Sequence, residues 1–167
     1  AMERTAETAF IESPVRESKS NGHVERAIRN WRDQYRTMRH HLEHRMKKVV
    51  LNESAMSTWL VAWAADVINR FRVQESGRTA FEMMTQHRCR HLVIGFAEKV
   101  HFQHTITSKD GYRKDVGIFL GMNDRNNSYL VGNRDGVYAS PHVMKMSDDQ
   151  AYDPDLMDEI KVRFYDY

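Results

Sequence analysis

Apolar residues recur along residues 24–49 in steps of three, four or seven, which is the period of one face of an α-helix. The stripe consists of Val24, Ile28, Trp31, Tyr35, Met38, Leu42 and Val49. Arginines lie on its flanks, and a polar run ending at Asn21 and Gly22 comes before it, so either of these two residues is the expected N-cap. The pattern predicts an amphipathic helix with a basic surface.

A second predicted helix spans about residues 54–73, and its apolar positions are too widely spread for a single stripe. They are Met56, Trp59, Leu60, Trp63, Ala64, Val67, Ile68 and Phe71. We therefore expect this helix to be buried on two sides. Thr79 is expected to cap one or two further helical turns over residues 79–84.

From Gly95 the pattern changes to short β-like runs. The runs cover residues 99–103, 116–121, 129–131 and 137–139, and turn-forming residues at 109–111, 123–127 and 133–136 separate them. We expect a small antiparallel unit that curls into a barrel, and another short strand at residues 8–11. The predicted fold class is α+β, with two to three helices followed by a small antiparallel β-barrel-like module. After residue 147 no apolar period returns until residue 160, so we expect poor order there.

The overall composition narrows the class of protein. A hydrophobic fraction of 41% in 167 residues is typical of a globular chain and not of a disordered or fibrous one. The single cysteine, Cys89, fits a reducing compartment. No apolar run approaches the roughly 20 residues of a membrane helix, and no signal peptide is recognisable. We expect no membrane partner and an intracellular location, nuclear or cytoplasmic.

Charge is distributed unevenly along the chain. The net charge is only +2, but residues 21–50 carry +5 and residues 147–167 carry −5. Binding to nucleic acid, if present, must therefore be local to the basic segment.

Glu25 lies at the start of the predicted basic helix, and two roles are open to it. A glutamate in the first turn suits the positive end of a helix and can form half of a capping box. Alternatively, it is a metal-binding carboxylate flanked by phosphate-binding cations, because Arg29 and Arg32 follow at i+4 and i+7. Composition and periodicity do not decide between these roles.

Five motifs follow one another between about residues 11 and 146. They are Ser13-Pro14 with Asn21-Gly22-x-x-Glu25-Arg26, Trp59-x-x-x-Trp63-Ala64-Ala65-x-x-x-Asn69, Gly77-x-Thr79-Ala80-x-Glu82, Gly95-Phe96, and Gly117-x-Phe119-Leu120-Gly121 with Ser128-Tyr129-Leu130. In this order they resemble the integrases of retroviruses and copia-type retrotransposons, whose third acidic catalytic residue lies in the first motif. Ala80 departs from the pattern, since family members commonly have proline there.

The resemblance implies a polynucleotidyl transferase with a ribonuclease-H-like core, in which two aspartates and one glutamate hold two Mg²⁺ ions. Glu25 matches the glutamate and is thereby the expected catalytic residue and metal ligand. The two aspartates would lie upstream of residue 1. We therefore expect this chain to be inactive by itself, with Mg²⁺ bound only in the complete parent enzyme.

The resemblance also implies DNA contacts on the basic helix. In related integrases the basic positions one and two turns past the glutamate touch DNA, and here these are Arg29 and Arg32. The expected nucleic-acid-binding residues are Arg26, Arg29, Arg32 and Arg36, with Arg39 continuing the row. For Arg36 and Arg39 a solvated helix face is the alternative. Five cations lie mainly in or beside the turns of the β unit: Lys99, Arg113, Lys114, Arg125 and Arg134. They are suited to contact with the DNA backbone, and the alternative is that they are ordinary surface residues.

The resemblance divides the chain into four parts. Residues 1–50 are the end of the catalytic core, 51–94 a helical connector, 95–146 the β module and 147–167 an acidic tail. The implied activity is DNA integration by strand transfer. The implied partners are DNA and the missing N-terminal half of the integrase or polyprotein, together with a further copy in a homo-oligomer.

Two other interpretations remain. His40 and His44 have the i,i+4 spacing that can hold a metal, with His41 beside them, and His87, Cys89 and His91 form a second cluster. Neither cluster has the spacing of a standard zinc module. The second interpretation is a non-enzymatic module, in which the apolar stripe of the first helix makes a coiled-coil or subunit contact and its basic face binds nucleic acid.

Overall fold

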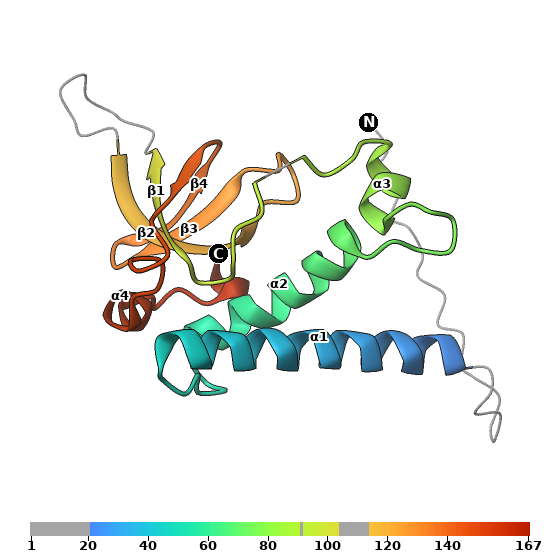
Figure 1. The fold of residues 1–167 in the computed structure, drawn as a ribbon, viewed down its shortest axis with the longest axis horizontal. Helices are drawn as coiled ribbons and strands as arrows, with labels where there is room; N and C mark the ends of the chain where they lie inside the picture. The colour runs from blue at the N-terminus through green and yellow to red at the C-terminus, as the bar shows by residue number, and fades with distance from the viewer. Residues whose placement is uncertain (1–20, 91, 104–113) are drawn as a thin grey trace, which may run out of the picture.

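The structure, a computed structural model, describes residues 21–90, 92–103 and 114–167. The predicted strand at 8–11 and turn at 109–111 lie outside the described residues, as do Ser13, Pro14, His91, Arg113 and the side chain of Lys114. The described chain forms helices first and then an antiparallel sheet, which confirms the α+β class (Figure 1). None of the described helices is both long enough and apolar enough to cross a membrane.

The predicted basic helix is α1 (Gly22–Met46), and its N-cap is Asn21. The apolar stripe changes its environment along the helix. Leu42 and Met46 are buried, whereas Val24 and Ile28 are 59% and 48% exposed. Val49 was expected on the stripe, but the helix ends three residues earlier and Val49 is exposed. The spacing of Val49 from Leu42 fits the helical period, but the helix has ended before Val49 and the chain there leads to α2.

The second helix, α2 (Ala55–Phe71), lies between α1 and the sheet (Figure 1). Its broad apolar set packs on both neighbours, so the predicted burial on two sides is confirmed. Trp59, Leu60 and Ala64 are at most 1% exposed. Ser54 caps the helix by accepting a hydrogen bond from the backbone N–H of Ser57.

The predicted cap at Thr79 is confirmed in α3 (Ala80–Thr85). The Thr79 side chain accepts a hydrogen bond from the Glu82 N–H, and the Glu82 carboxylate accepts one from the Thr79 N–H. This reciprocal capping box satisfies two backbone donors that a short helix otherwise leaves open. It gives a structural reason for the spacing of threonine and glutamate in the third motif.

Five antiparallel strands form one sheet in the order β4-β3-β2-β1-β5. Their bounds are β1 (Lys99–Gln103), β2 (Lys114–Met122), β3 (Tyr129–Asn133), β4 (Gly136–Ser140) and β5 (Val143–Lys145). The four predicted strands and the two predicted turns among the described residues are confirmed. The short strand β5 was not predicted, because three residues carry too little alternation to be recognised.

Two glycines of the fifth motif are required by the sheet. A side chain at Gly117 would begin 2.6 Å from Val131 Cγ1 and 2.7 Å from the Gly132 carbonyl oxygen, so only glycine lets β3 approach β2. Gly121 has φ +154° and lies where the pairing of β2 with β3 shifts register. The motif Gly117-x-Phe119-Leu120-Gly121 is therefore explained locally by strand pairing and by a β-bulge.

Residues 147–167, for which poor order was expected, are packed against the core. Pro154–Glu159 form the short helix α4, and Phe164–Asp166 form the 3₁₀ helix η2. Met157 and Ile160 are at most 5% exposed, and the Trp59 indole N–H donates to the Val162 carbonyl at 2.8 Å. The expectation of poor order was wrong because a few spaced apolar side chains can hold a segment in place by packing against the rest of the core.

One hydrophobic core runs through the described chain. It joins side chains of α1, α2, the sheet and α4, from Leu42 to Ile160. The segment boundaries at residues 50, 94 and 146 stay predictions, and the packing across them is continuous. Val24 and Ile28 in the first turns of α1 are not part of this core, and the candidate site begins there and follows the exposed face of the helix to Arg36.

Candidate nucleic-acid interface

Glu25 lies in the first turn of α1 with its side chain exposed. Because Asn21 is the N-cap, the capping-box position three residues later is Val24 and not Glu25. The Asn21 side chain makes no cap hydrogen bond either. Glu25 can still favour the positive end of the helix, but it is not placed to close a capping box.

Three exposed arginines follow Glu25 along one line of the helix surface. Steps of four, three and four residues lead from Glu25 to Arg29, Arg32 and Arg36, and such steps keep side chains on one face. The three arginines, here called the basic row, span about 10 Å at 1.5 Å rise per residue. A row of exposed guanidiniums at this spacing can bind successive phosphate oxygens along one nucleic-acid strand.

The basic row is open to solvent. Arg29 and Arg32 make no ion pair or side-chain hydrogen bond with another described residue. Arg36 is paired only with Asp33, at 4.0 Å, and both side chains are more than 60% exposed. Arg26 directly follows Glu25, so it lies about 100° around the helix and off the row.

Arg39 is not part of this open surface, although it was expected to continue the row. Its guanidinium donates to the Glu43 carboxylate at 3.0 Å, to Asn52 Oδ1 at 2.6 Å and to the Val50 carbonyl at 2.6 Å. Glu43 also accepts from the Val50 N–H. Burial raises the pKa of Glu43, but the hydrogen bonds from Arg39 and Val50 outweigh it and lower that pKa overall. Arg39 therefore stabilises the turn between α1 and α2 through these hydrogen bonds.

No candidate metal site forms within the described residues. They contain no group of three or more His, Cys, Asp and Glu side chains close enough to hold a metal ion. Within the described chain, Glu25 therefore belongs to no such group. His41 contacts the Tyr152 hydroxyl at 3.5 Å instead of joining His40 and His44. Of the second cluster, His91 lies outside the described residues.

Of the cations expected on the β unit and described in the structure, Arg125 and Arg134 are exposed and Lys99 is not. Lys99 forms an ion pair with Asp153 at 3.1 Å, with both side chains about a third exposed or less. Arg134 lies in the turn between β3 and β4 and pairs with Asp135 at 3.6 Å. Arg125 is exposed in the turn between β2 and β3. Backbone-directed binding at these turns remains a prediction.

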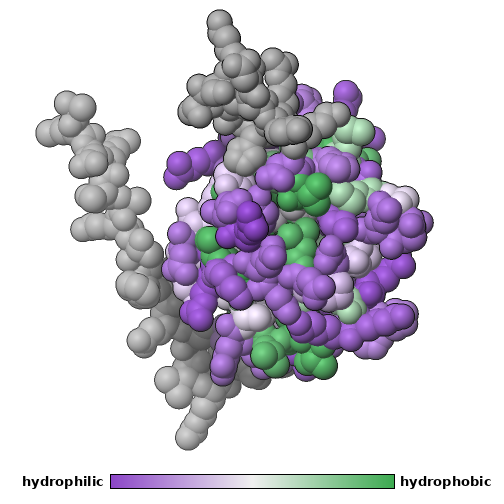
Figure 2. All heavy atoms as spheres, turned by 90° about the vertical axis from the view of Figure 1, so that its left-hand side faces the viewer, coloured by the Kyte–Doolittle hydropathy of each residue, from purple (hydrophilic) through white to green (hydrophobic). Residues whose placement is uncertain are grey.

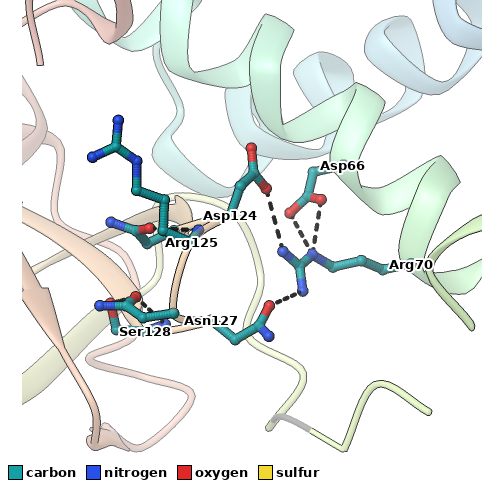
Figure 3. A network of polar contacts seen from close by, with 8 residues as sticks. Asp66, Arg70, Asp124, Arg125, Asn127 and Ser128 are labelled. Carbon is teal, nitrogen blue, oxygen red and sulfur yellow. Dashed lines mark hydrogen bonds and ion pairs between the residues drawn. The ribbon is translucent and has the colours of Figure 1, made fainter. Parts of the chain in front are cut away.

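A buried arginine, which the sequence pattern did not reveal, joins the helices to the sheet (Figure 3). Arg70 Nε donates to both carboxylate oxygens of Asp66, at 2.8 and 2.7 Å, and Nη1 donates to Asn127 Oδ1 at 2.9 Å. Asp124 lies 3.5 Å from Nη2. The guanidinium also stacks over the Phe81 ring of α3 at 4.7 Å. The Arg70 side chain is only 2% exposed, so these partners replace its hydration.

The Arg70 network joins α2, α3 and the turn between β2 and β3. Burial raises the pKa of the Asp66 carboxyl, and the hydrogen bonds and charge of Arg70 act against that rise. The neighbouring Arg125 guanidinium points away from the network toward solvent (Figure 3). The one sequence signal was the i,i+4 spacing of aspartate and arginine on α2, which many exposed helix pairs share.

Comparison with known protein families, with curated proteins and with solved structures finds no match.

Proposed function

We propose that this chain is the glutamate-bearing part of a retrotransposon integrase and that α1 binds the DNA backbone through its basic row. The observation that carries the proposal is the exposed line of Arg29, Arg32 and Arg36 beginning at an exposed Glu25. The five ordered motifs described above support the same family. Binding through the row would be independent of base sequence, since guanidiniums that reach phosphates do not read base edges.

In this proposal α1 and its surroundings are the last part of a ribonuclease-H-like core, and the sheet is a barrel-like module. The strand order supports the second part. β4 and β5 lie at opposite edges of the sheet but are joined by only Pro141 and His142. The Ser140 hydroxyl also accepts from the Gln103 N–H and lies 3.2 Å from the Gln103 carbonyl. Such a short link between opposite edges favours strong curling.

The catalytic part of the proposal needs groups that the described residues do not supply. A two-metal site for strand transfer requires several carboxylates around the Mg²⁺ ions. Glu25 is a single ligand, so the described residues do not fit the metal pair by themselves. In the proposal, two aspartates from the rest of the enzyme complete the site, and no reaction step is assigned to this chain alone.

A salt series with duplex DNA tests the binding. We expect Arg29→Ala with Arg32→Ala to weaken binding and to reduce the slope of log K against log salt by about one to two, at about 0.9 per lost phosphate contact. Arg78→Ala with Arg88→Ala is the matched control, because it removes the same charge from two exposed arginines that are not among the predicted DNA contacts. Equal effects of the two pairs would mean that only net charge matters and would contradict the basic row.

Strand transfer tests the role of Glu25. In a complete enzyme that supplies both aspartates, Glu25→Gln removes one negative metal ligand while preserving shape. We expect loss of Mg²⁺-dependent strand transfer with folding and DNA binding retained. Glu53→Gln, at an exposed position near the start of α2, is the control and should keep full activity. An active Glu25→Gln enzyme would leave Glu25 without a catalytic role.

A non-enzymatic module remains the second candidate, and one observation favours it. Val24 and Ile28 continue the buried stripe of α1 but are about half exposed. A helix from another copy could cover them by extending the packing that α2 provides further along. A stable oligomer at high salt, which persists while DNA binding is lost, would favour this candidate.

A further inference from the structure

The cations of α1 fall into two groups with different surroundings. In the N-terminal part, Arg26, Arg29 and Arg32 form no ion pair with a described residue, and Arg36 has only the loose contact with Asp33. Near the C-terminal end of α1, Arg45 and the His41 ring contact Tyr152, and Lys48, two residues after the helix ends, pairs with Asp158. The boundary between the two groups lies near Arg39, which is occupied by the turn after the helix.

Residues 148–159, here called the acidic segment, supply these contacts. The segment contains six aspartates and glutamates and no lysine or arginine. Asp158 forms an ion pair with Lys48. Tyr152 lies under the Arg45 guanidinium at 5.2 Å from the ring centre, and its hydroxyl lies 3.5 Å from His41 Nε2. The acidic segment therefore places a carboxylate and an aromatic ring against Lys48 and Arg45, which themselves stay exposed to solvent.

The segment is fixed in this place by packing and hydrogen bonds. Ala151 and Met157 are buried, and the Lys99 N–H donates to the Ala151 carbonyl at 2.7 Å. Asp153 caps α4 and pairs with Lys99 at 3.1 Å. Asp155, Asp158 and Glu159 are exposed and belong to α4, which lies on the left-hand side of the molecule in Figure 1. Figure 2 shows that side, and its described surface is mostly hydrophilic.

We propose that the acidic segment acts as a fixed negative boundary, which excludes nucleic acid from the C-terminal part of α1 and confines it to the basic row. This inference rests on the proposed binding of DNA by α1. A phosphate approaching Lys48 meets the Asp158 carboxylate that is paired with it, and the charge of this carboxylate acts over a screening length of about 10 Å at 0.1 M salt. Arg29 lies about 24 Å from Arg45 along the helix, which is beyond that range.

Neutralising the exposed acids tests the boundary in the full chain. The variant changes three side chains: Asp155→Asn, Asp158→Asn and Glu159→Gln. We expect tighter binding to duplex DNA at 0.1 M salt, by about threefold to tenfold, and a salt slope steeper by about one, since Lys48 becomes available to a phosphate. The control neutralises three exposed acids outside the segment: Glu75→Gln, Asp135→Asn and Asp166→Asn. Equal tightening in both variants would overturn the proposal.

A double-mutant comparison locates the effect. In the unaltered chain, Lys47→Ala with Lys48→Ala should leave the salt slope unchanged, because DNA does not reach these lysines. In the neutralised variant, the same pair should remove the added slope. A loss of slope in the unaltered chain would overturn the boundary. The Arg29 and Arg32 variants are measured separately. An unchanged salt slope in those variants would contradict the basic row, whereas an unchanged affinity in the neutralised variant would contradict only the boundary.

Discussion

At the scale of single residues, Arg70 is the most strongly constrained charge in the described chain. A guanidinium that is 2% exposed loses its water and needs a partner for each donor direction. Asp66 comes from the same helix, Asn127 from the turn between β2 and β3, and Phe81 from α3. One side chain thereby sets the relative positions of three elements.

Replacing Arg70 should lower the stability of the fold. Arg70→Met leaves Asp66 as a largely buried, unpaired carboxylate, and we expect a loss of about 3–5 kcal/mol in the free energy of unfolding. Arg72→Met, at an exposed position two residues on, should change stability by less than about 0.5 kcal/mol. Urea denaturation measures both. Adding Asp66→Leu to Arg70→Met should recover much of the loss, and the absence of recovery would mean that the ion pair is not the cause.

At the scale of elements, the ends of the helices are defined by side chains. Ser54, Thr79 and Asp153 each accept a hydrogen bond from a backbone N–H at the start of α2, α3 and α4. α1 has no such side-chain cap at Asn21. From Asn30 onward one face of α1 packs on α2, and Glu25 and the basic row are exposed on other positions of the helix.

The cap of α4 should make stability depend on pH. The Leu156 N–H and then Lys99 lower the pKa of Asp153 below its usual value. A carboxyl with a lowered pKa adds stability above its unfolded pKa of about 3.9, and this is lost as pH falls through the folded pKa. We expect Asp153→Ala to cost about 1 kcal/mol at pH 7 and much less near pH 3, measured by urea denaturation at both values. Asp153→Asn keeps a capping oxygen and should cost less, and a cost independent of pH would contradict the charge effect.

At the scale of the whole molecule, the sheet and the helices form one packed unit. α2 lies between α1 and β2, and residues after 147 close the core from the other end of the chain (Figure 1). The charges follow this arrangement. The basic row lies in the N-terminal half of α1 and reaches its middle, whereas the acidic segment lies against its C-terminal end.

Local patterns in the sequence were sufficient for most elements. The helical period of residues 24–42, the cap at Thr79 and the turns rich in Asn and Gly predicted α1, α3 and the hairpins correctly. These features depend on neighbours within four residues, where periodicity and capping act. The basic row was also predictable, because residues at steps of three and four share a helix face whatever surrounds the helix.

Contacts between distant residues decided the rest. No local pattern distinguishes Arg39 and Arg70, which are held by groups on other elements, from Arg29 and Arg32, which remain open. Likewise, the apolar period of α1 did not reveal that Val24 and Ile28 are exposed. The sparse apolar residues after 147 did not reveal that Met157 and Ile160 are buried in the core. By itself the sequence determined which side chains share a face. Which of those faces are covered follows from the folded arrangement, because burial and pairing depend on groups brought together from remote parts of the chain.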